Sequence, residues 1–342
     1  MSRLLRWAGS AIATIAVLVL IAILAVWIIS SQKLHATIEP KAETLATPTP
    51  AQIADAPRQG RVLGCFSCHG EGLRGNKMFD EPNVGTVWAP NLTAMAAKAT
   101  DQQLARAIRQ GIGTDGRSLF IMPSEGFQNL SDQEVAAIIA MIRSLPRGGS
   151  DTPRNVYGPL GRIGIAMGKF KSAPQMVSEY GNRGPIPVGS QYGPGRRLAM
   201  LNCSACHNAD LTGREVGPSE VSPDLQIVGA YDLPAFKKLL RTGVPAGGQK
   251  LGMMGSTAKS DLSHMNDAEI EQLYAYLHAR AEKLSRQTAV ATFRSEDYWL
   301  RKRRVAWPTR SRSSSAAFAR TASTAGSRGR SAAFAATILT AR

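Results

Sequence analysis

The hydrophobic pattern of the chain begins with one long uncharged run near the N-terminus. No charged residue lies between Trp7 and Ile29, and a helix of that length, at about 1.5 Å per residue, can cross the roughly 30 Å hydrocarbon core of a bilayer. Arg3 and Arg6 precede the run, which favours a cytoplasmic N-terminus. The alternative is a cleaved secretory signal, but its apolar region is usually shorter. The sequence therefore predicts a single membrane anchor over residues 1–33.

Further along the chain, apolar residues recur with the period of a helix. Ser131 and Asn266 each have a Glu three positions later and an apolar run after it, a pattern in which the cap and the Glu satisfy exposed backbone donors. We predict helices there and over 101–110 and 233–241. No convincing alternation indicates a strand, so the predicted fold class is all-α. The buried helix positions are predicted to be Leu104, Ile108, Val135, Ile138, Ile139, Ile142, Leu145, Phe236, Leu239, Leu240, Ile270, Leu273, Tyr274 and Leu277.

A set of short motifs occurs twice in the same order. Residues 64–69 (GCFSCH) recur as residues 202–207 (NCSACH). The other matches are 73–75 with 211–213, 89–92 with 222–225, and 130–134 with 265–269. Four matches in one order indicate a duplicated domain. The sequence therefore predicts tandem domains over 57–147 and 195–285.

The segments around these domains have a different composition. Residues 34–56 are rich in Pro, Ala and Thr and are predicted to be a flexible linker. Residues 148–194 are rich in Gly and Pro and are predicted to be a connector. Its apolar middle, 160–170, suits either a domain surface or the bilayer interface, and the sequence does not decide between them. Residues 286–342 lack an apolar period and predict a basic, disordered tail.

Composition and charge exclude two broad classes of protein. Hydrophobic residues make up 44% of the 342 residues and charged residues 19%, which excludes wholesale disorder. The net charge of +16 suggests nucleic acid as a partner, but +10 of it lies in residues 286–342. The two repeated domains are almost neutral. We therefore expect no nucleic-acid partner.

All four cysteines lie in two C-x-x-C-H motifs, the signature of c-type haem attachment. Two thiols three positions apart on one helical turn can bond to the two vinyl groups of one porphyrin, and the adjacent His then faces the iron. A redox dithiol would need a βαβ context, and a zinc site would need four thiolates together. We predict two covalently bound haems and no disulfide. The attachment residues and proximal ligands are Cys65, Cys68 and His69, then Cys203, Cys206 and His207.

The distal ligand of the first haem is predicted to be a methionine. The chain has only five histidines, and the first domain contains none besides His69, so its distal ligand is Met or its site is open. Met95 and Met141 lie in predicted helices, where packing is the expected role. Met122 lies in a loop between helices and is followed by Pro123, which stiffens the backbone. We therefore choose Met122 over Met78 and these two.

In the second domain several residues compete for the distal position. Met265 aligns with an apolar core position of the first domain, and His264 is expected at the surface or at the entry of the capped helix. Met253 and Met254 occupy the loop equivalent to that of Met122, after allowing for a short insertion. These residues alone leave Met253 and Met254 as alternatives.

Over residues 57–285 the motifs resemble bacterial membrane-anchored dihaem c-type cytochromes made of two class-I cytochrome c domains. In that family the distal Met precedes the C-terminal helix, in sequences similar to Met-Pro-Ser-Glu and Leu-Met-Ser. Residues 122–125 match the first, and residues 253–255 (MMG) approximate the second, which favours Met254. The resemblance also implies that the carbonyls of Pro90 and Pro223 accept hydrogen bonds from the proximal imidazoles. Similar subunits of membrane-bound alcohol and gluconate dehydrogenases usually carry three haems.

The expected function is electron transfer rather than catalysis, so no catalytic residue is predicted. Histidine and methionine together saturate the iron and raise its potential. We expect a cytochrome tethered to the bacterial inner membrane, with its haem domains in the periplasm. It would pass electrons from a dehydrogenase or quinol-oxidising complex to a terminal oxidase or a soluble cytochrome. The alternatives are a dihaem peroxidase-like enzyme with one open haem site and a haem sensor that exchanges a ligand.

Overall fold

The computed structural model describes residues 2–181, 183–217 and 220–305. The chain divides into two units, Met1–Val290 and Ala291–Arg342, and the contacts that bear on function lie within the first. Of the predicted basic tail, residues 306–342 lie outside the described residues. Residues 286–305 belong to the last helix, α14 (Asp267–Val305).

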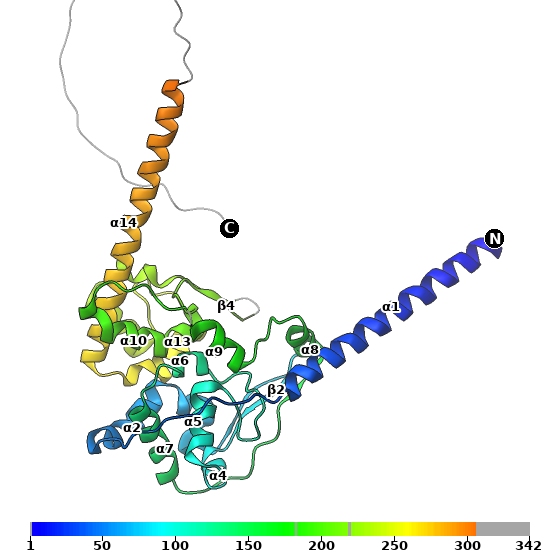
Figure 1. Ribbon diagram of the computed structural model, residues 1–342, viewed down its shortest axis with the longest axis horizontal. Helices are drawn as coiled ribbons and strands as arrows, with labels where there is room; N and C mark the ends of the chain where they lie inside the picture. Colours follow the sequence, from blue (N-terminus) through cyan, green and yellow to red (C-terminus); the bar gives the residue numbers. More distant parts are fainter. Residues whose placement is uncertain (1, 182, 218–219, 306–342) are drawn as a thin grey trace, which may run out of the picture. The chain divides into compact units, whose positions relative to one another are not determined.

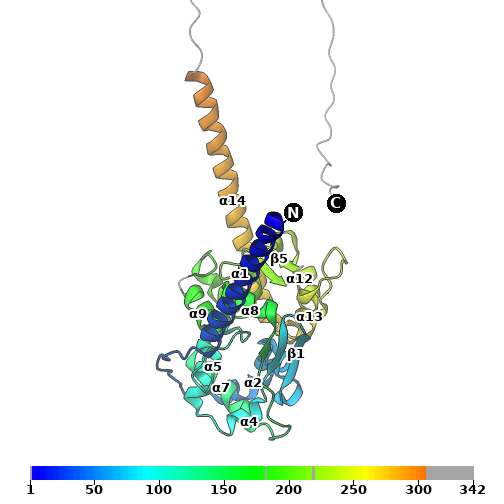
Figure 2. The ribbon, with the colours of Figure 1, turned by 90° about the vertical axis from the view of Figure 1, so that its right-hand side faces the viewer.

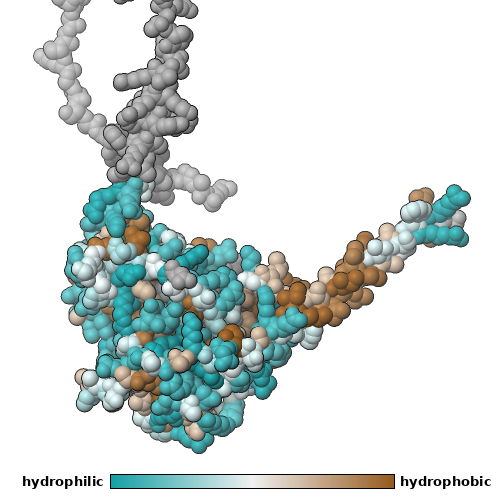
Figure 3. All heavy atoms as spheres, in the orientation of Figure 1, coloured by the Kyte–Doolittle hydropathy of each residue, from teal (hydrophilic) through white to brown (hydrophobic). Residues whose placement is uncertain are grey.

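The N-terminal apolar run forms one continuous helix, α1 (Ser2–His35). It is long and apolar enough to be a candidate membrane span, and its apolar side chains are exposed along its length (Figure 3). Residues 37–45 were predicted to be flexible but contact the first repeat. The Ile38 N–H donates to the Gly116 carbonyl at 3.1 Å, and the Arg109 guanidinium pairs with Glu43 at 2.5 Å. Composition alone does not reveal these distant partners.

The first repeat packs helices around a buried apolar core (Figure 1). Its first helix begins inside the predicted linker, because Thr49 and Gln52 form a capping box ahead of it. Ser131 and Glu134 form the predicted capping box, and the apolar face behind them is buried. The elements are α2 (Pro50–Val62), α3 (Cys65–His69), η1 (Glu71–Leu73), β1 (Asn76–Glu81), β2 (Gly85–Ala89), α4 (Leu92–Ala96), α5 (Asp101–Gln110), α6 (Ser124–Phe127) and α7 (Asp132–Ser144).

The second repeat has the same order of helices around a second core. Asn266 and Glu269 exchange the predicted hydrogen bonds at 2.8 and 2.9 Å before α14. Phe236, Leu239 and Leu240 are buried as predicted. The elements before α14 are η2 (Ser190–Tyr192), α10 (Gly193–Asn202), α11 (Ser204–His207), β4 (Arg214–Gly217), β5 (Glu220–Ser222), η3 (Leu225–Ala230), α12 (Leu233–Thr242), α13 (Met253–Ser260) and η4 (Leu262–His264).

The described residues are mostly helical, as predicted, but they also form two small antiparallel sheets. Strands β1 and β2 pair with each other, and β2 also pairs with β3 (Val156–Tyr157) from the connector. Strands β4 and β5 form the equivalent hairpin of the second repeat. Sequence periodicity missed β1 because its residues are mostly exposed on both faces. The connector also contains two helices, α8 (Pro159–Ala166) and α9 (Ala173–Gly181).

Candidate haem-binding sites

Both C-x-x-C-H motifs form a short helical turn that ends at the histidine. The turn begins at Cys65 in the first repeat and just after Cys203 in the second. Burial raises the pKa of the Cys65 thiol and of the Cys203 thiol to about 12, so neither of these two is an activated thiolate. Within the described part of the chain, no group of three or more His, Cys, Asp or Glu side chains could hold a metal ion. These observations fit the predicted covalent attachment better than zinc binding or dithiol chemistry.

The turn that follows each histidine has the same backbone conformation in both repeats. Leu73 and Leu211 are fully buried with φ of 55° and 65°, in the left-handed region that non-glycine residues rarely adopt. The next glycine in each repeat, Gly75 or Gly213, donates its N–H to the carbonyl of the histidine, at 2.9 and 2.8 Å. Both histidines are thus held by the same turn, which extends the sequence repeat to local geometry.

Both histidines are oriented by a proline carbonyl, as the resemblance implied. The distance from Nδ1 of His69 to the Pro90 oxygen is 2.8 Å, and the distance from Nδ1 of His207 to the Pro223 oxygen is also 2.8 Å. Because Nδ1 donates to a carbonyl, Nε2 carries the free lone pair that a metal can accept. Burial lowers the pKa of both imidazoles, although the carbonyl contact opposes this effect. Each ring is therefore in the neutral form that ligates iron.

An apolar cavity lies beside the first C-x-x-C-H turn. The cavity is partly open to solvent. The lining brings together the predicted residues Cys65, Cys68, His69 and Met122, and it also includes Met78 and Met95. Met141 is instead buried in α7, where a Cβ on Gly60 would lie 3.2 Å from its sulfur, so its predicted packing role is confirmed. A cavity with apolar walls, two thiols and an oriented imidazole fits a c-type haem.

Met254 lies in the first turn of α13, where the sequence predicted a loop. Its side chain is partly buried and packs against the same apolar core as Cys203, whereas Met253 is 45% exposed. The backbone N–H of Met253 donates to Glu220 Oε1 at 2.6 Å, which ties the start of this helix to β5. Met265 is buried in the core, as predicted. Of the two candidates, Met254 is the one directed toward the core.

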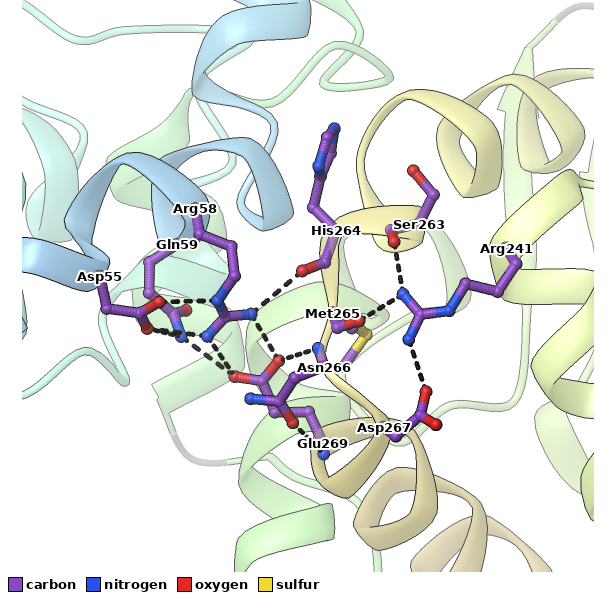
Figure 4. Close-up of polar contacts among 10 residues, drawn as sticks. All are labelled: Asp55, Arg58, Gln59, Arg241, Ser263, His264, Met265, Asn266, Asp267 and Glu269. Carbon is purple, nitrogen blue, oxygen red and sulfur yellow. Dashed lines mark hydrogen bonds and ion pairs between the residues drawn. The ribbon is translucent and has the colours of Figure 1, made fainter.

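The first helices of the two repeats reach across to the capping boxes of the opposite repeat. Arg58 on α2 donates to Glu269 at 2.8 and 3.0 Å and to the His264 carbonyl at 3.1 Å, and Asp55 holds the same guanidinium at 2.7 Å (Figure 4). Conversely, Arg197 on α10 pairs with Glu134. The sequence indicated Glu134 and Glu269 as parts of helix caps. No sequence pattern indicated that each also binds an arginine of the other repeat.

The cores of the two repeats are also shared. Val62 of α2 is buried in the second core, and Leu201 of α10 is buried in the first. A Cβ on Gly126, in α6, would lie 3.0 Å from the Leu201 carbonyl oxygen, so the segment after Met122 packs closely on the helix before the second motif. Each C-x-x-C-H segment is therefore held partly by the other repeat.

A carboxyl group from the opposite repeat lies beside each motif. A Cβ on Gly64 would lie 3.2 Å from Asp261 Oδ2, and Asp261 also hydrogen-bonds to Ser67 in the first motif. Glu125 of the first repeat interacts electrostatically with Cys206 in the second motif. Burial raises the pKa of both Asp261 and Glu125. Glu125 is part of the Met-Pro-Ser-Glu match, but no sequence pattern indicated that it or Asp261 lies next to a motif of the other repeat, because both approach that motif only through the contact between repeats.

Comparison with known proteins supports the same assignment. The cytochrome c family model matches residues 51–146 and 193–280, which together make up more than half of the chain. The fructose dehydrogenase cytochrome subunit of Gluconobacter japonicus is 24% identical over 287 residues, covering 72% of this chain and 57% of the relative. A nicotinate dehydrogenase subunit of Pseudomonas putida is 26% identical over 217 residues, covering 57% of this chain and 17% of the relative.

The chain thus spans little more than half the length of the first relative and under a fifth of the second. The match to the family model covers both C-x-x-C-H motifs and the helices on either side of them. The chain is therefore a member of the cytochrome c family, whose proteins transfer electrons with c-type haem.

Proposed function

We propose that this protein is a membrane-tethered dihaem cytochrome that relays single electrons on the periplasmic side of the bacterial inner membrane. The observation that carries the proposal is the first cavity. It brings two attachment thiols, a neutral oriented imidazole and the thioether of Met122 into one apolar space. The second repeat has the same turn, the same carbonyl contact and a partly buried methionine. The domain limits we propose remain 57–147 and 195–285.

Cys65 and Cys68 would attach the first haem, and His69 and Met122 would ligate its iron. Cys203 and Cys206 would attach the second haem, and His207 and Met254 would ligate its iron. When bound, each haem supplies a one-electron couple at its iron. The protein orients the imidazoles through Pro90 and Pro223 and keeps water away with apolar walls. With a histidine and a methionine on each iron, no ligand position would be left for a substrate, and the protein would act as a relay.

Helix α1 and the N-terminal arginines support the tether and its orientation. The helix is a candidate membrane span, and Arg3 and Arg6 favour a cytoplasmic N-terminus. The haem domains would then lie on the opposite, periplasmic side. Both relatives are named as parts of dehydrogenases, which supports a dehydrogenase as electron donor. A quinol-oxidising complex is the other donor, and a terminal oxidase or soluble cytochrome is the acceptor.

The ligation can be tested on the purified full-length protein. We expect the denatured protein to contain two c-type haems per chain, and the reduced native protein not to bind carbon monoxide. Rapid carbon monoxide binding and peroxide turnover would instead show an open iron and support a peroxidase-like enzyme. Exchange of an axial ligand on binding a small molecule would support a sensor. The donor can then be identified by pull-down from detergent-solubilised membranes.

A further inference from the structure

Helix α8, from the connector, is fixed to the end of helix α1 (Figure 1 and Figure 2). The Lys33 ammonium donates to the carbonyls of Ile165 and Ala166 at 3.0 and 3.1 Å, which satisfies the C-terminal end of α8. The Arg162 guanidinium donates to the hydroxyls of Ser30 and Ser31 at 3.0 and 3.2 Å.

Arg162 also stacks on an aromatic ring at the end of the apolar run. Its guanidinium carbon lies 3.7 Å from the centroid of the Trp27 ring. If α1 spans the bilayer, Trp27 lies at the headgroup level, where amphipathic rings are favoured. Helix α8 contacts α1 at that same level. The contact with α1 would therefore also fix the position of α8 along the membrane normal.

The opposite side of α8 is committed to the first repeat. A Cβ on Gly161 would lie 2.1 Å from the Val84 carbonyl oxygen, so the helix backbone lies directly against the turn between β1 and β2. Ile165 is completely buried. Helix α8 is therefore held between α1 and the first repeat and has little freedom to turn its exposed face elsewhere.

The exposed face of this segment combines apolar and basic residues. Leu160 is 57% exposed and Met167 is 69% exposed, and Ile163 and Phe170 are also exposed. Residues 152–171 contain no Asp or Glu. Arg154 and Lys169 are exposed basic residues, whereas Arg162 is bound to α1 and Lys171 pairs with Glu179 at 2.6 Å. Such a mixture of apolar and basic side chains is typical of a helix that lies in the interface of an anionic membrane.

We propose that α8 and residues 167–171 lie in the headgroup layer and dock the first repeat onto an anionic lipid surface. The inference rests on the proposed membrane tether. Residues 160–170 lie against the surface of the first repeat, and in this proposal their exposed side also lies in the bilayer interface. The proposal also places one haem cavity at the membrane surface, because β3 leads directly into α8 and the Tyr157 ring lies 6.0 Å from Phe120, which lines the first cavity.

The test uses full-length protein in vesicles of phosphatidylcholine and phosphatidylglycerol. Met167→Cys provides a thiol on α8, and Val221→Cys provides a matched control, since Val221 is 68% exposed in β5 of the second repeat. We expect a charged, membrane-impermeant maleimide to modify the thiol at position 167 about tenfold more slowly than the thiol at position 221. Leu160→Cys is a second probe if the first variant fails to incorporate haem.

Two outcomes would overturn the proposal, and they are distinguishable. If alkaline carbonate leaves the protein in the membrane but positions 160 and 167 react as fast as position 221, the tether stands and α8 faces water. If carbonate extracts the protein, the tether itself fails and the docking inference fails with it. Slow labelling at positions 160 and 167 in carbonate-resistant protein supports the inference.

Discussion

We expect the thioether of Met122 to decide the properties of the first haem. Replacing Met122 by Ala should remove one of two axial ligands, so the far-red ferric sulfur-to-iron band of that haem should disappear and its midpoint potential should fall. The ferric spectrum and a spectroelectrochemical titration measure both effects. Carbon monoxide should also bind to the reduced variant.

Two other methionines in the same cavity provide matched controls. Met78 and Met95 line the cavity together with Met122, so Met78→Leu and Met95→Leu keep an apolar side chain of similar volume there. Both variants should keep the far-red band. If Met95→Leu removes the band while Met122→Ala retains it, the distal ligand lies in α4 and the assignment is wrong.

The carboxyl group of Asp261 is expected to tune the potential of the haem in the opposite repeat. It interacts electrostatically with Cys65 and Cys68, and its Oδ1 has no hydrogen-bond partner among the described residues. A negative charge near a haem favours the ferric form. Asp261→Asn should therefore raise the midpoint potential of the first haem and leave that of the second nearly unchanged.

The control for this effect is Glu71→Gln. Glu71 follows the same motif closely, but its side chain is 79% exposed and pairs with Arg61 at the surface. Solvent screens such a charge, so this variant should change the potential little. Equal shifts in the two variants would show that the position of Asp261 between the repeats has no special effect.

For individual residues, the sequence predicts the histidine side of each site but does not predict which residues of the other repeat contact it. His69 and Pro90 are only 21 positions apart, within one repeat. Arg58 and Glu269 are 211 positions apart, and no local pattern links them. Arg280 is a similar case, since a helical pattern would place it in water. In the structure Arg280 is buried, and its Nη1 donates to Asp224 Oδ1 at 2.8 Å.

Among the elements, the contact of α2 with the second repeat should contribute measurably to stability. Arg58→Ala removes the hydrogen bonds to Glu269 and leaves a mostly buried carboxylate without its main partner. The expected loss is about 1–3 kcal/mol in the free energy of unfolding. Urea unfolding followed by circular dichroism measures it.

Lys98→Ala is the matched control for that loss. The Lys98 and Asp151 side chains are 67% and 75% exposed, so their pair should contribute less than about 1 kcal/mol. A similar loss in both variants would contradict a specific role for the contact between the repeats.

The same contact predicts how stability depends on pH. Burial alone would raise the pKa of Glu269 and of Glu134, but their hydrogen bonds and the arginine charges hold both pKa values below the usual 4.5 of a glutamate. The unfolded chain therefore binds these protons more readily, and their stabilising contribution is present above about pH 4.5 and is lost as the pH falls further. The free energy of unfolding of the wild-type protein should therefore decrease as the pH is lowered from about 5 to about 3. The decrease should be less steep for Arg58→Ala.

Helices with strong local signals were predictable, and elements that depend on distant partners were not. Ser131 and Asn266 cap their helices as predicted, because the cap and its Glu are three residues apart. Helix α8 contains two glycines and begins at Pro159 in a Gly- and Pro-rich segment, so its composition predicts a connector. Its hydrogen bonds to α1 involve partners more than a hundred residues away.

For the whole molecule, the tether should be separable from the haem sites. Within the described residues, neither apolar core contains a side chain from α1. Deleting residues 2–29 and supplying a cleavable secretory signal in their place should therefore release the protein from the α1 anchor while leaving the haem spectrum and both potentials unchanged. Fractionation and spectroscopy of the deletion variant test this prediction. Altered axial ligation in the deletion variant would show that α1 supports the haem sites.

The exchange of Val62 and Leu201 between the two cores has a consequence for how the duplicated halves can diverge. Neither half is a complete unit that could be transplanted into another protein, because a buried position in each would be left unfilled. The spacing between the halves is fixed by packed side chains rather than by the intervening chain. Insertions in that chain would be tolerated only outside β3, α8 and α9, and there they would leave the packing between the two cores unchanged.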